Sequence, residues 1–514
     1  MKIAKLPVIA YAMLLSSCSM DYEQYASFDV YYPNAFVTQK EAVLGSAAYR
    51  DSSLYVSDNE ISMEGGFEYA DNDIIGYGHC WVKGNYTPYI NKDSSNCIIH
   101  ETFINSGERF HSLITGLEHE TSYSIRSFVI TRNGSVGYNP TVFKATTSVP
   151  HDKWYDCGLL NINGKAIPQR ADGVSIVAEE DGDTVTYFGL GRNGSSCYND
   201  FYCYSSKNKA YRQLSNMKEA LWGAAGFYLD TEDDKKNKIR RIYVGTGCTR
   251  ADNYTFDDYT QQFFCYDMAT NKWEQVSFFF DGAAMDASIN VFAGQVRTGA
   301  VAFGIYGYGF VGLGECEMYG EKMYPNDFYT FVMDTDEKGN ATPTRGYFKQ
   351  MTQRFPYDTR SGMSAVAIND IVYLAGGIGA KGKNFCDMYR CAFSAPEGAD
   401  VSAYEFKWTR LSDTHPFPDG FKGRGYGVAF SIGENFYWGS GEDSQGNLYS
   451  DFVKYELSSN RIIKCAPYKN GDPDEDNKEI SRAFVINGGD RAFVGGGRIS
   501  GEEKYVNNNW VYRP

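Results

Sequence analysis

The chain has 514 residues, roughly enough for two to four domains, and 43% of them are hydrophobic, so it can build sizeable cores. Its formal net charge of −15 argues against a nucleic-acid partner, because binding to a phosphate backbone depends on clustered Lys and Arg. Aromatic residues make up 16% of the chain, and there are 53 glycines. This composition is typical of a protein that is rich in strands and turns.

The first eighteen residues are predicted to be an export signal. Two lysines precede an apolar run at 6–15, which is too short to span a bilayer and fits a signal peptide. The run ends in "LSSC", which resembles the lipobox of bacterial lipoproteins. That resemblance implies that 1–18 is a lipoprotein signal peptide and that Cys18 is lipidated, with its acyl chains in a membrane. An ordinary secretory signal is the alternative.

Residues 19–34 are expected to form a linker. Its beginning, "SMDYEQ", has scattered acids similar to the surface-export signals of Bacteroidetes lipoproteins. We therefore expect an exported protein with a lipid anchor in the outer membrane. The sequence leaves open which side of that membrane the protein faces.

Residues 35–148 are predicted to form a β-sandwich. Short alternating runs such as "SYSIRSFVI" are separated by clusters of Gly, Asn and Asp, which is typical of antiparallel strands. The phrase "GLEHETSY" resembles the fibronectin type III pattern, in which a leucine, here Leu117, is followed by a corner tyrosine, here Tyr123. The resemblance implies an immunoglobulin-like or fibronectin III-like sandwich. Nothing in this segment indicates catalysis, so we expect a spacer or interaction role.

Residues 152–514 contain six copies of one repeat. In each copy an aromatic-rich strand ends at a glycine, as in "YFGLG" and "FVGGG". The closing glycines are at 191, 247, 314, 377, 441 and 497. One small apolar strand precedes this motif and two strands follow it, so each copy predicts a four-stranded propeller blade. The glycine doublets resemble kelch repeats. The expected fold is all-β, with a six-bladed kelch-type β-propeller behind the sandwich.

The last repeat lacks its fourth strand, because the chain ends at Pro514 after the third. The stretch "DKWYDCGLL" at 152–160 has the form of that missing strand. Its Trp154 stands where the fourth strands of other repeats carry Trp273 and Trp408. We therefore expect the first strand of this domain to complete the last blade and to close the ring.

Arginines recur near the start of the first strand of five repeats. They are Arg170, Arg297, Arg360, Arg424 and Arg482. Three of them stand 17 residues before the closing glycine, which indicates one shared position in space. The start of the first strand and the end of the second emerge on the same face. We therefore expect these arginines around the mouth of the central channel, with Glu315 and Glu442 in the adjoining loops.

Two interpretations of the arginines remain open. They either tie neighbouring blades together or hold an anionic or polyhydroxylated ligand in paired hydrogen bonds. Membership of the kelch family would favour the second, because arginine at this position in that family often lines the ligand-binding face. The ligand-binding set is then the five arginines with Glu315 and Glu442.

The sequence favours a binding protein over an enzyme. No cysteine spacing suits zinc and no Ser-His-Asp constellation can be placed, so we assign no catalytic residue, metal or cofactor. The main hypothesis is a lipid-anchored envelope or cell-surface protein that binds a glycan or a protein through its Arg-lined face. It has no nucleic-acid partner, and its oligomeric state is undetermined.

Two alternative functions remain. Resemblance to the bacterial sialic acid mutarotases, which are also six-bladed and exported, implies a sugar-acid mutarotase or epimerase. In that case Arg297, Arg360 or Arg424 would hold a carboxylate while Glu315 or Glu442 moves protons. The other alternative is a structural component of the envelope whose sandwich domain makes the contact.

Overall fold

The computed structural model describes residues 49–514, except 58, 68–73, 91–95, 103, 106, 119–120, 133, 149–151, 234, 279–293, 395–403, 472–478 and 500–503. The predicted signal peptide, Cys18 and the linker lie outside the described residues. Contacts divide the chain into two units, Met1–His151 with Tyr155–Cys157, and Asp152–Trp154 with Gly158–Pro514. Within the described residues, no helix is long and apolar enough to cross a membrane.

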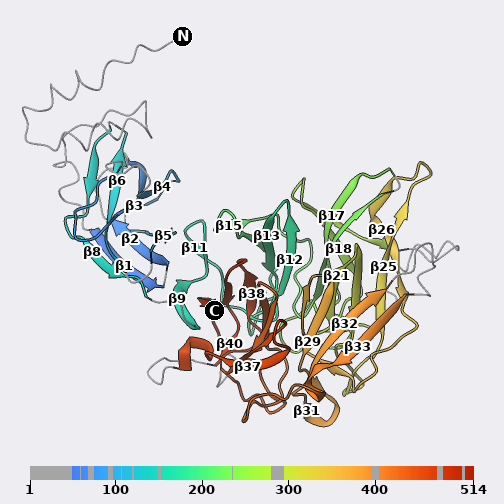
Figure 1. Ribbon diagram of the computed structural model, residues 1–514. Helices are drawn as coiled ribbons and strands as arrows, with labels where there is room; N and C mark the ends of the chain where they lie inside the picture. The colour runs from blue at the N-terminus through green and yellow to red at the C-terminus, as the bar shows by residue number, and fades with distance from the viewer. Residues whose placement is uncertain are drawn as a thin grey trace, which may run out of the picture. The chain divides into compact units, whose positions relative to one another are not determined.

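The first unit is a sandwich of two antiparallel sheets (Figure 1). One sheet has the order β1 (Tyr49–Val56), β2 (Glu60–Phe67), β5 (Arg109–Thr115). The other has the order β4 (Cys97–His100), β3 (Ile74–Lys83), β6 (Ser122–Thr131), β7 (Val136–Tyr138), and β8 (Phe143–Thr146) also pairs with β6. The predicted corner tyrosine is buried, and the hydroxyl of Tyr123 accepts a hydrogen bond of 3.0 Å from the backbone N–H of Glu118. The fibronectin III-like assignment itself stays a prediction.

Strand β6 is buried on both faces, which explains an irregular pattern in its sequence. Tyr123 and Ile125 belong to one apolar cluster, whereas Phe128 and Ile130 belong to another. Because neighbouring side chains of a strand point to opposite faces, these two pairs need no bulge between them.

A polar group lies inside the sandwich. The ring nitrogen Nδ1 of His79 lies 2.8 Å from the hydroxyl of Ser112, and Nε2 of His100 lies 3.1 Å from the same hydroxyl. His79 is fully buried, and its Nε2 is 3.9 Å from a carboxylate oxygen of Asp51. Burial, and then the neighbouring His100 and His111, lower the pKa of His79 to about 3. His79 is therefore neutral in the folded protein at any ordinary pH.

Acid is expected to destabilise this sandwich through His79. The unfolded chain binds a proton below about pH 6.5 whereas the folded one does not, so stability falls as the pH falls from 6.5 towards 3. At pH 4.5 the loss should be about 2–3 kcal/mol. Asp51, whose pKa burial raises, works in the opposite direction. Hydrogen exchange of β3 and β6 at pH 7 and 4.5 measures the effect, and a His79→Gln variant should show a flatter pH dependence.

The second unit is a β-propeller, and within the described residues it has six antiparallel blades in chain order (Figure 1). The first three blades are β12 (Val174–Glu180), β13 (Asp183–Gly189), β14 (Phe201–Ser205), β15 (Ala210–Gln213); β16 (Ala225–Glu232), β17 (Lys238–Gly245), β18 (Phe263–Asp267), β19 (Lys272–Gln275); and β21 (Val301–Ile305), β22 (Tyr308–Gly312), β25 (Phe328–Thr335), β26 (Ala341–Gln350). The last three are β28 (Ser364–Ile368), β29 (Ile371–Ala375), β32 (Met388–Ser394), β33 (Glu405–Arg410); β34 (Val428–Ile432), β35 (Asn435–Gly439), β36 (Phe452–Glu456), β37 (Arg461–Cys465); and β38 (Phe484–Asn487), β39 (Ala492–Gly495), β42 (Asn508–Arg513), β9 (Lys153–Leu159). The prediction of an all-β chain with a six-bladed propeller is confirmed.

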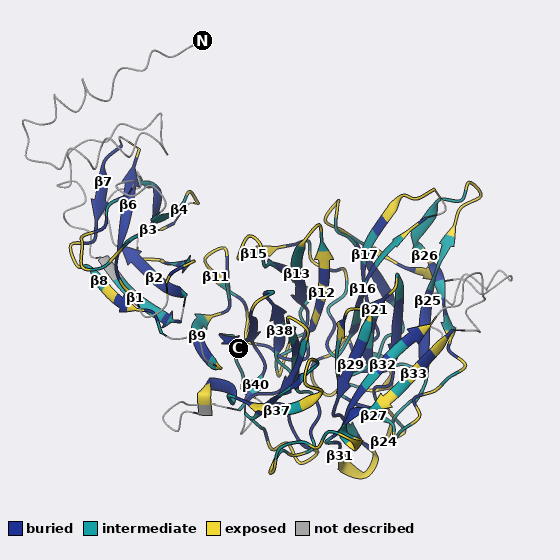
Figure 2. Ribbon diagram, in the orientation of Figure 1, coloured by how far each residue is buried: buried dark blue, intermediate teal, exposed yellow. Residues whose placement is uncertain are grey.

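Short elements occupy the connections between these strands. They are β10 (Asn161–Ile162), β11 (Lys165–Ala166), β20 (Ser277–Phe278), β23 (Cys316–Met318), β24 (Glu321–Met323), β27 (Arg360–Ser361), β30 (Ile378–Gly379), β31 (Lys383–Asn384), β40 (Arg498–Ile499), β41 (Lys504–Tyr505) and the single 3-10 turns η2 (Phe256–Asp258), η3 (Ala380–Gly382), η5 (Leu411–Asp413) and η6 (Tyr468–Gly471). Buried residues concentrate in the first three strands of each blade, and the fourth strands are more exposed (Figure 2).

The expected closing strand is present. Strand β9 lies beside β42 in the last blade, and Trp154 packs in one apolar cluster with Trp510 and Tyr512. The Trp154 ring lies 5.1 Å from that of Phe452 at the start of β36 in the preceding blade. Trp273 lies 5.0 Å from Phe201 in the equivalent way. The last blade therefore uses the same packing as the others, although its fourth strand comes from the other end of the domain.

The closing glycines join each blade to the next. Gly191 has a φ of +92°, and a Cβ there would lie 2.4 Å from the carbonyl oxygen of Ala171, so the position requires glycine. The N–H of each closing glycine donates to a carbonyl at the start of the following blade, at 2.7–3.0 Å, in the pairs 191–221, 247–297, 314–360, 377–424, 441–480 and 497–170. The last pair returns to the first blade.

Candidate functional site

Four of the five predicted arginines lie inside the blades. Arg170, Arg297, Arg360 and Arg424 have exposed fractions of 0–1%. Each Nη1 donates to a carboxylate just before the third strand, in the pairs Arg170–Asp200, Arg297–Asp327, Arg360–Asp387 and Arg424–Asp451. Each Nη1 also donates to the carbonyl of the residue before the closing glycine, and each Nε to the carbonyl two residues upstream.

The shared spacing therefore marks a structural tie within each blade. The spacing predicted these four guanidinium groups at the channel mouth, but the structure places them where a ligand does not reach. The physical reason is that each buried guanidinium group is already neutralised by an aspartate, which is buried in the case of Asp387 and partly exposed in the other three pairs. The second and sixth blades lack the tie, and the equivalent positions hold Leu221 with Gln262 and Ile480 with Asn508.

Arg482 does not share this position, because it stands two residues further along its blade. The residues at its position form a closed ring of six backbone hydrogen bonds of 2.7–3.2 Å. In order, the N–H of each donates to the carbonyl of the one before it: Asp172, Gly223, Gly299, Gly362, Tyr426, Arg482 and again Asp172. Because these bonds pass through all six blades and return to the first, the ring encircles the propeller axis.

Three members of this ring carry side chains in an unusual backbone conformation. All six residues have φ between +52° and +63°, a region that suits glycine. The other three members are Asp172, Tyr426 and Arg482, and each pays a steric penalty for its side chain. Other residues share this conformation, among them Leu190 and Leu313 just before closing glycines, but these three bring charged or aromatic side chains to the propeller axis. The middle of the ring is therefore the best candidate for the site.

The side chains of the ring lie across its opening. A Cβ on Gly362 would come within 2.7 Å of the Tyr426 ring, so this ring covers the glycine. The guanidinium carbon of Arg482 lies 3.5 Å from the centre of the Tyr426 ring. Arg482 in turn donates to Asp172 at 2.6 Å. Together these side chains close the central channel at this face.

A chain of alternating charges runs through the ring. Arg192 donates to Asp172 at 3.0 Å, and Arg482 joins Asp172 to Glu442 at 2.6 and 2.7 Å. Arg498 donates to the other oxygen of Glu442 at 2.6 Å. The cations at the two ends have partly exposed side chains, 16% for Arg192 and 27% for Arg498. Arg482 between them is 15% exposed, so a ligand can reach all three arginines of this charge chain, and Arg498 most easily.

Glu442 is held as a carboxylate. Burial acts to raise its pKa, but Arg482 and then Arg498 outweigh burial, so the pKa of Glu442 lies below its ordinary value. Both carboxylate oxygens also accept hydrogen bonds, including one of 2.6 Å from Ser481. This carboxylate is suited to positioning arginines and poorly suited to moving a proton at neutral pH.

Glu315 lies on the other side of the ring. It accepts a hydrogen bond of 3.1 Å from the Tyr426 hydroxyl, and Lys322 approaches it at 3.2 Å. Burial, and then the Glu315 charge, raise the pKa of Tyr426. The structure thus brings Glu315, Glu442 and Arg482 together at the ring, three of the seven predicted ligand-binding residues.

Sequence reasoning missed Asp172, Arg192, Tyr426 and Arg498. Arg192 packs flat on Trp222, with its guanidinium carbon 3.5 Å from the ring centre, and Tyr254 lies against the same tryptophan at 5.1 Å. One signal was available: Arg482 is 15 residues before its closing glycine and three other arginines are 17 residues before theirs. That offset separates the exposed site from the buried ties.

The cysteines of these loops do not build a metal centre or a disulfide. Cys248 and Cys316, in the loops after the second and third closing glycines, are buried free thiols. Among the residues that the structure describes, no group of three or more His, Cys, Asp or Glu is placed to hold a metal ion.

Similarity to known proteins is low. No protein-family model matches the chain, and no curated protein matches it. A solved structure described as "Structure of YjhT" is 13% identical, with a TM-score of 0.44, and the match covers 68% of this chain and 95% of that chain.

Proposed function

We propose that this chain is an exported, lipid-anchored, kelch-type binding protein that takes an acidic glycan at the ring. The observation that carries the proposal is the set of three strained, charged or aromatic side chains at the centre of one propeller face. Arg192, Arg498 and Lys322 present cationic groups around it, and arginine pairs well with carboxylates. Trp222 and Tyr254 add flat faces of the kind that stack on sugars.

Anchoring through Cys18 is the part of this proposal that rests on the leader sequence alone. Fractionation of producing cells tests it, because a lipidated protein stays with the membranes and a processed secretory protein does not.

Replacement of Arg498 by glutamine is expected to weaken binding of an acidic sugar at least tenfold. The change removes one charge-assisted hydrogen-bond donor from the exposed end of the charge chain. Titration calorimetry of the full chain with glucuronate and N-acetylneuraminate measures the effect, with glucose as the neutral comparison. Arg461→Gln, an exposed arginine on the outer strand β37, is the matched control and should leave binding unchanged.

Two results would contradict this proposal. One is glucose binding as tightly as the acids, and the other is Arg498→Gln and Arg461→Gln having the same effect. If no glycan on an array bound and the ring face retained a protein instead, the ligand would be a protein.

A sugar-acid mutarotase is the second candidate function, and the contact between Tyr426 and Glu315 favours it. A carboxylate 3.1 Å from a tyrosine hydroxyl is a pair that can pass a proton. In this candidate mechanism the four buried arginines do not contact the substrate. Of the two glutamates that the sequence offered, Glu315 rather than Glu442 moves the proton. Nuclear magnetic resonance of anomer exchange decides: acceleration that is lost in Glu315→Gln supports catalysis, and binding without acceleration refutes it.

A further inference from the structure

The central channel contains a cavity of about 760 Å³ behind the ring. Its lining begins three residues beyond each ring member, at Ser175, Gly226, Ala302, Ala365, Ala429 and Val485. At the other end it reaches the turns between first and second strands, at Gly307, Asp370 and Gly433. Since Tyr426 and Arg482 lie across the ring, the cavity is closed there and opens on the opposite face of the propeller.

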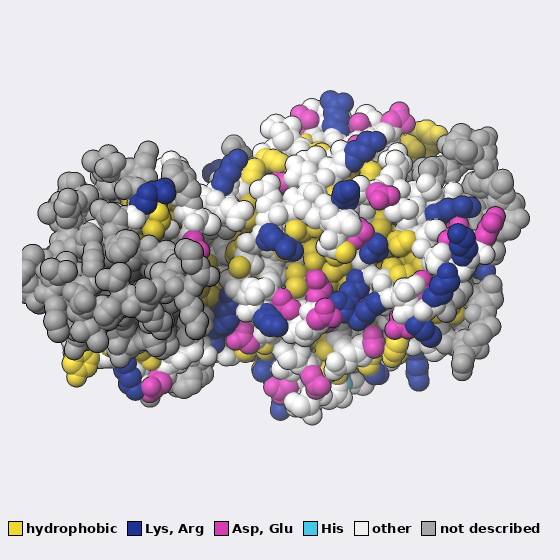
Figure 3. All heavy atoms as spheres, turned by 90° about the horizontal axis from the view of Figure 1, so that it is seen from above, with side chains coloured by type: hydrophobic (Ala, Val, Ile, Leu, Met, Phe, Trp, Pro, Cys, Tyr) yellow, Lys and Arg dark blue, Asp and Glu magenta, His cyan; other side chains and the backbone are white. Residues whose placement is uncertain are grey.

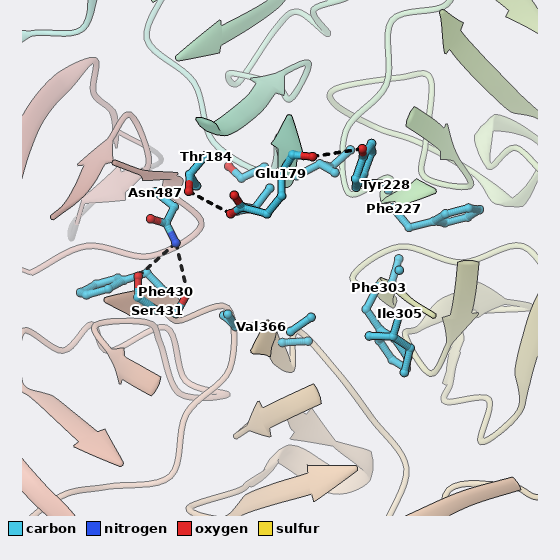
Figure 4. Close-up of a pocket in the computed structure, with 18 of the residues that line it drawn as sticks. Glu179, Thr184, Phe227, Tyr228, Phe303, Ile305, Val366, Phe430, Ser431 and Asn487 are labelled. Carbon is cyan, nitrogen blue, oxygen red and sulfur yellow. Dashed lines mark hydrogen bonds between the residues drawn. The ribbon is translucent and has the colours of Figure 1, made fainter. Parts of the chain in front are cut away.

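The two sides of this cavity differ in chemistry. The fourth and fifth blades contribute mainly small or apolar side chains, among them Ala365, Val366 and Ala429, together with the carboxylate of Asp370 at the outer end. The first and second blades contribute Glu179 and Tyr228, and the close-up shows Glu179 across the cavity from Val366 (Figure 4). Its size lies within the range of small-molecule sites, roughly 300–1,000 Å³.

Three carboxylates line the cavity, and among the described residues an ion pair is formed by Asp230 but not by Glu179 or Asp370. One oxygen of Glu179 accepts a hydrogen bond of 2.9 Å from Thr184. Asp230, by contrast, has Arg240 at 3.4 Å and Lys238 at 3.7 Å. No lysine or arginine occurs among the described residues that line the cavity. Burial raises the pKa of Glu179, which a cation bound beside it would reverse.

Tyr228 adds a hydroxyl on the same side of the cavity, close to the backbone carbonyl of Glu179. This hydroxyl lies 3.2 Å from a carboxylate oxygen of Asp230 and 3.4 Å from the carbonyl of Glu179, which leaves its oxygen free to accept a further hydrogen bond (Figure 4). An ammonium group has three N–H donors and no acceptor, so it suits a wall that offers a carboxylate and further oxygen acceptors.

We infer that the cavity is a second binding site, separate from the ring, for a small molecule that carries an ammonium group on an aliphatic body. The ammonium group contacts the carboxylate of Glu179, and the aliphatic part lies along the alanine and valine wall. Such a ligand enters from the face of the hairpin turns, where hydrophobic, acidic and basic side chains are intermingled (Figure 3). The ring-face ligand and this one therefore do not compete.

Titration of the full chain with cadaverine tests the inference, with pentanediol as the neutral and glutarate as the acidic analogue of similar length. Cadaverine should bind at least tenfold more tightly than pentanediol, and glutarate should not bind. Glu179→Gln keeps the shape of the side chain and should lower cadaverine affinity at least tenfold, while pentanediol is unaffected. Ala367→Leu narrows the cavity and should weaken both.

Two controls separate this site from others. Glu405→Gln removes an exposed carboxylate from the outer strand β33, and Arg498→Gln alters the ring face. Both should leave cadaverine binding unchanged, even if the proposal for the ring face fails. Equal affinities for cadaverine and pentanediol would overturn the inference, and so would equal losses in Glu179→Gln and Glu405→Gln, which would mean attraction to the acidic surface alone.

Discussion

Replacement of Asp387 by alanine is expected to lower the free energy of unfolding of the propeller by about 3–5 kcal/mol. The side chains of Arg360 and Asp387 are 1% and 2% exposed, and their hydrogen bond measures 2.6 Å. Without the carboxylate, the guanidinium group stays buried beside Phe385, 3.5 Å from its ring centre, with two backbone carbonyls and the Tyr389 hydroxyl as neutral acceptors. Urea unfolding of the purified chain measures the loss.

The second blade provides an internal control for this experiment. It folds with Leu221 and Gln262 at the two positions of the tie, and Leu221 is fully buried. The double variant Arg360→Leu with Asp387→Gln copies that blade and should recover at least half of the loss, because no charge remains to be buried. Asp358→Ala, which breaks an exposed pair with Lys383 in the same blade, should cost less than about 1 kcal/mol. If Asp387→Ala also lowered the free energy of unfolding by less than about 1 kcal/mol, the buried ion pair would contribute little to stability.

The same comparison shows why the sequence located the arginines but misjudged their surroundings. A spacing of 17 residues places residues at one position of a repeat, but it carries no information about which way a side chain points. The partner aspartates stand 30 or 27 residues downstream, in motifs such as "NDFYCY", and look like the beginning of a strand. Arg170 departs from the spacing because β12 and β13 have seven residues each, whereas β28 and β29 have five.

The ring was beyond reach of the sequence for a different reason. Three of its six members are glycine, as the backbone conformation favours, but the other three are Asp172, Tyr426 and Arg482, which share no residue type with one another. Hydrogen bonds between them join neighbouring blades, so they exist only once all six blades are in place. A local pattern therefore finds the glycines of the repeat, whereas the polar side chains at its centre follow from closure of the whole domain.

Closure of the ring was predictable, because it follows from the number of strands in each repeat and needs no knowledge of where the side chains point. Six repeats with one missing fourth strand require a donor, and one aromatic phrase at the start of the domain had the required form. The structure adds the means of attachment. Asn470 accepts a hydrogen bond from the N–H of Trp154 and donates one to its carbonyl, both at 2.8 Å, although the two residues are 316 apart.

Replacement of Trp154 by alanine is therefore expected to cost about 3–5 kcal/mol and to open the ring at one place. The side chain is 1% exposed, its Nε1 donates to the carbonyl of Ala466 at 3.1 Å, and its ring packs on those of Phe452 and Tyr512 at 5.1 Å. Because β9 has no hairpin to hold it next to β42, loss of this packing should release the strand as a unit and leave an exposed sheet edge.

Trp273→Ala is the matched variant, because Trp273, although only partly buried, packs on the equivalent rings of Phe201 and Tyr266, and its strand is joined to the preceding one by a turn. It should cost less, and its strand should stay paired. Hydrogen exchange distinguishes the two: amides of β42 should lose protection in Trp154→Ala and keep it in Trp273→Ala. Unchanged protection of β42 in Trp154→Ala would mean that the ring is held by its inter-blade hydrogen bonds alone, and the two proposed sites would then not depend on the closing strand.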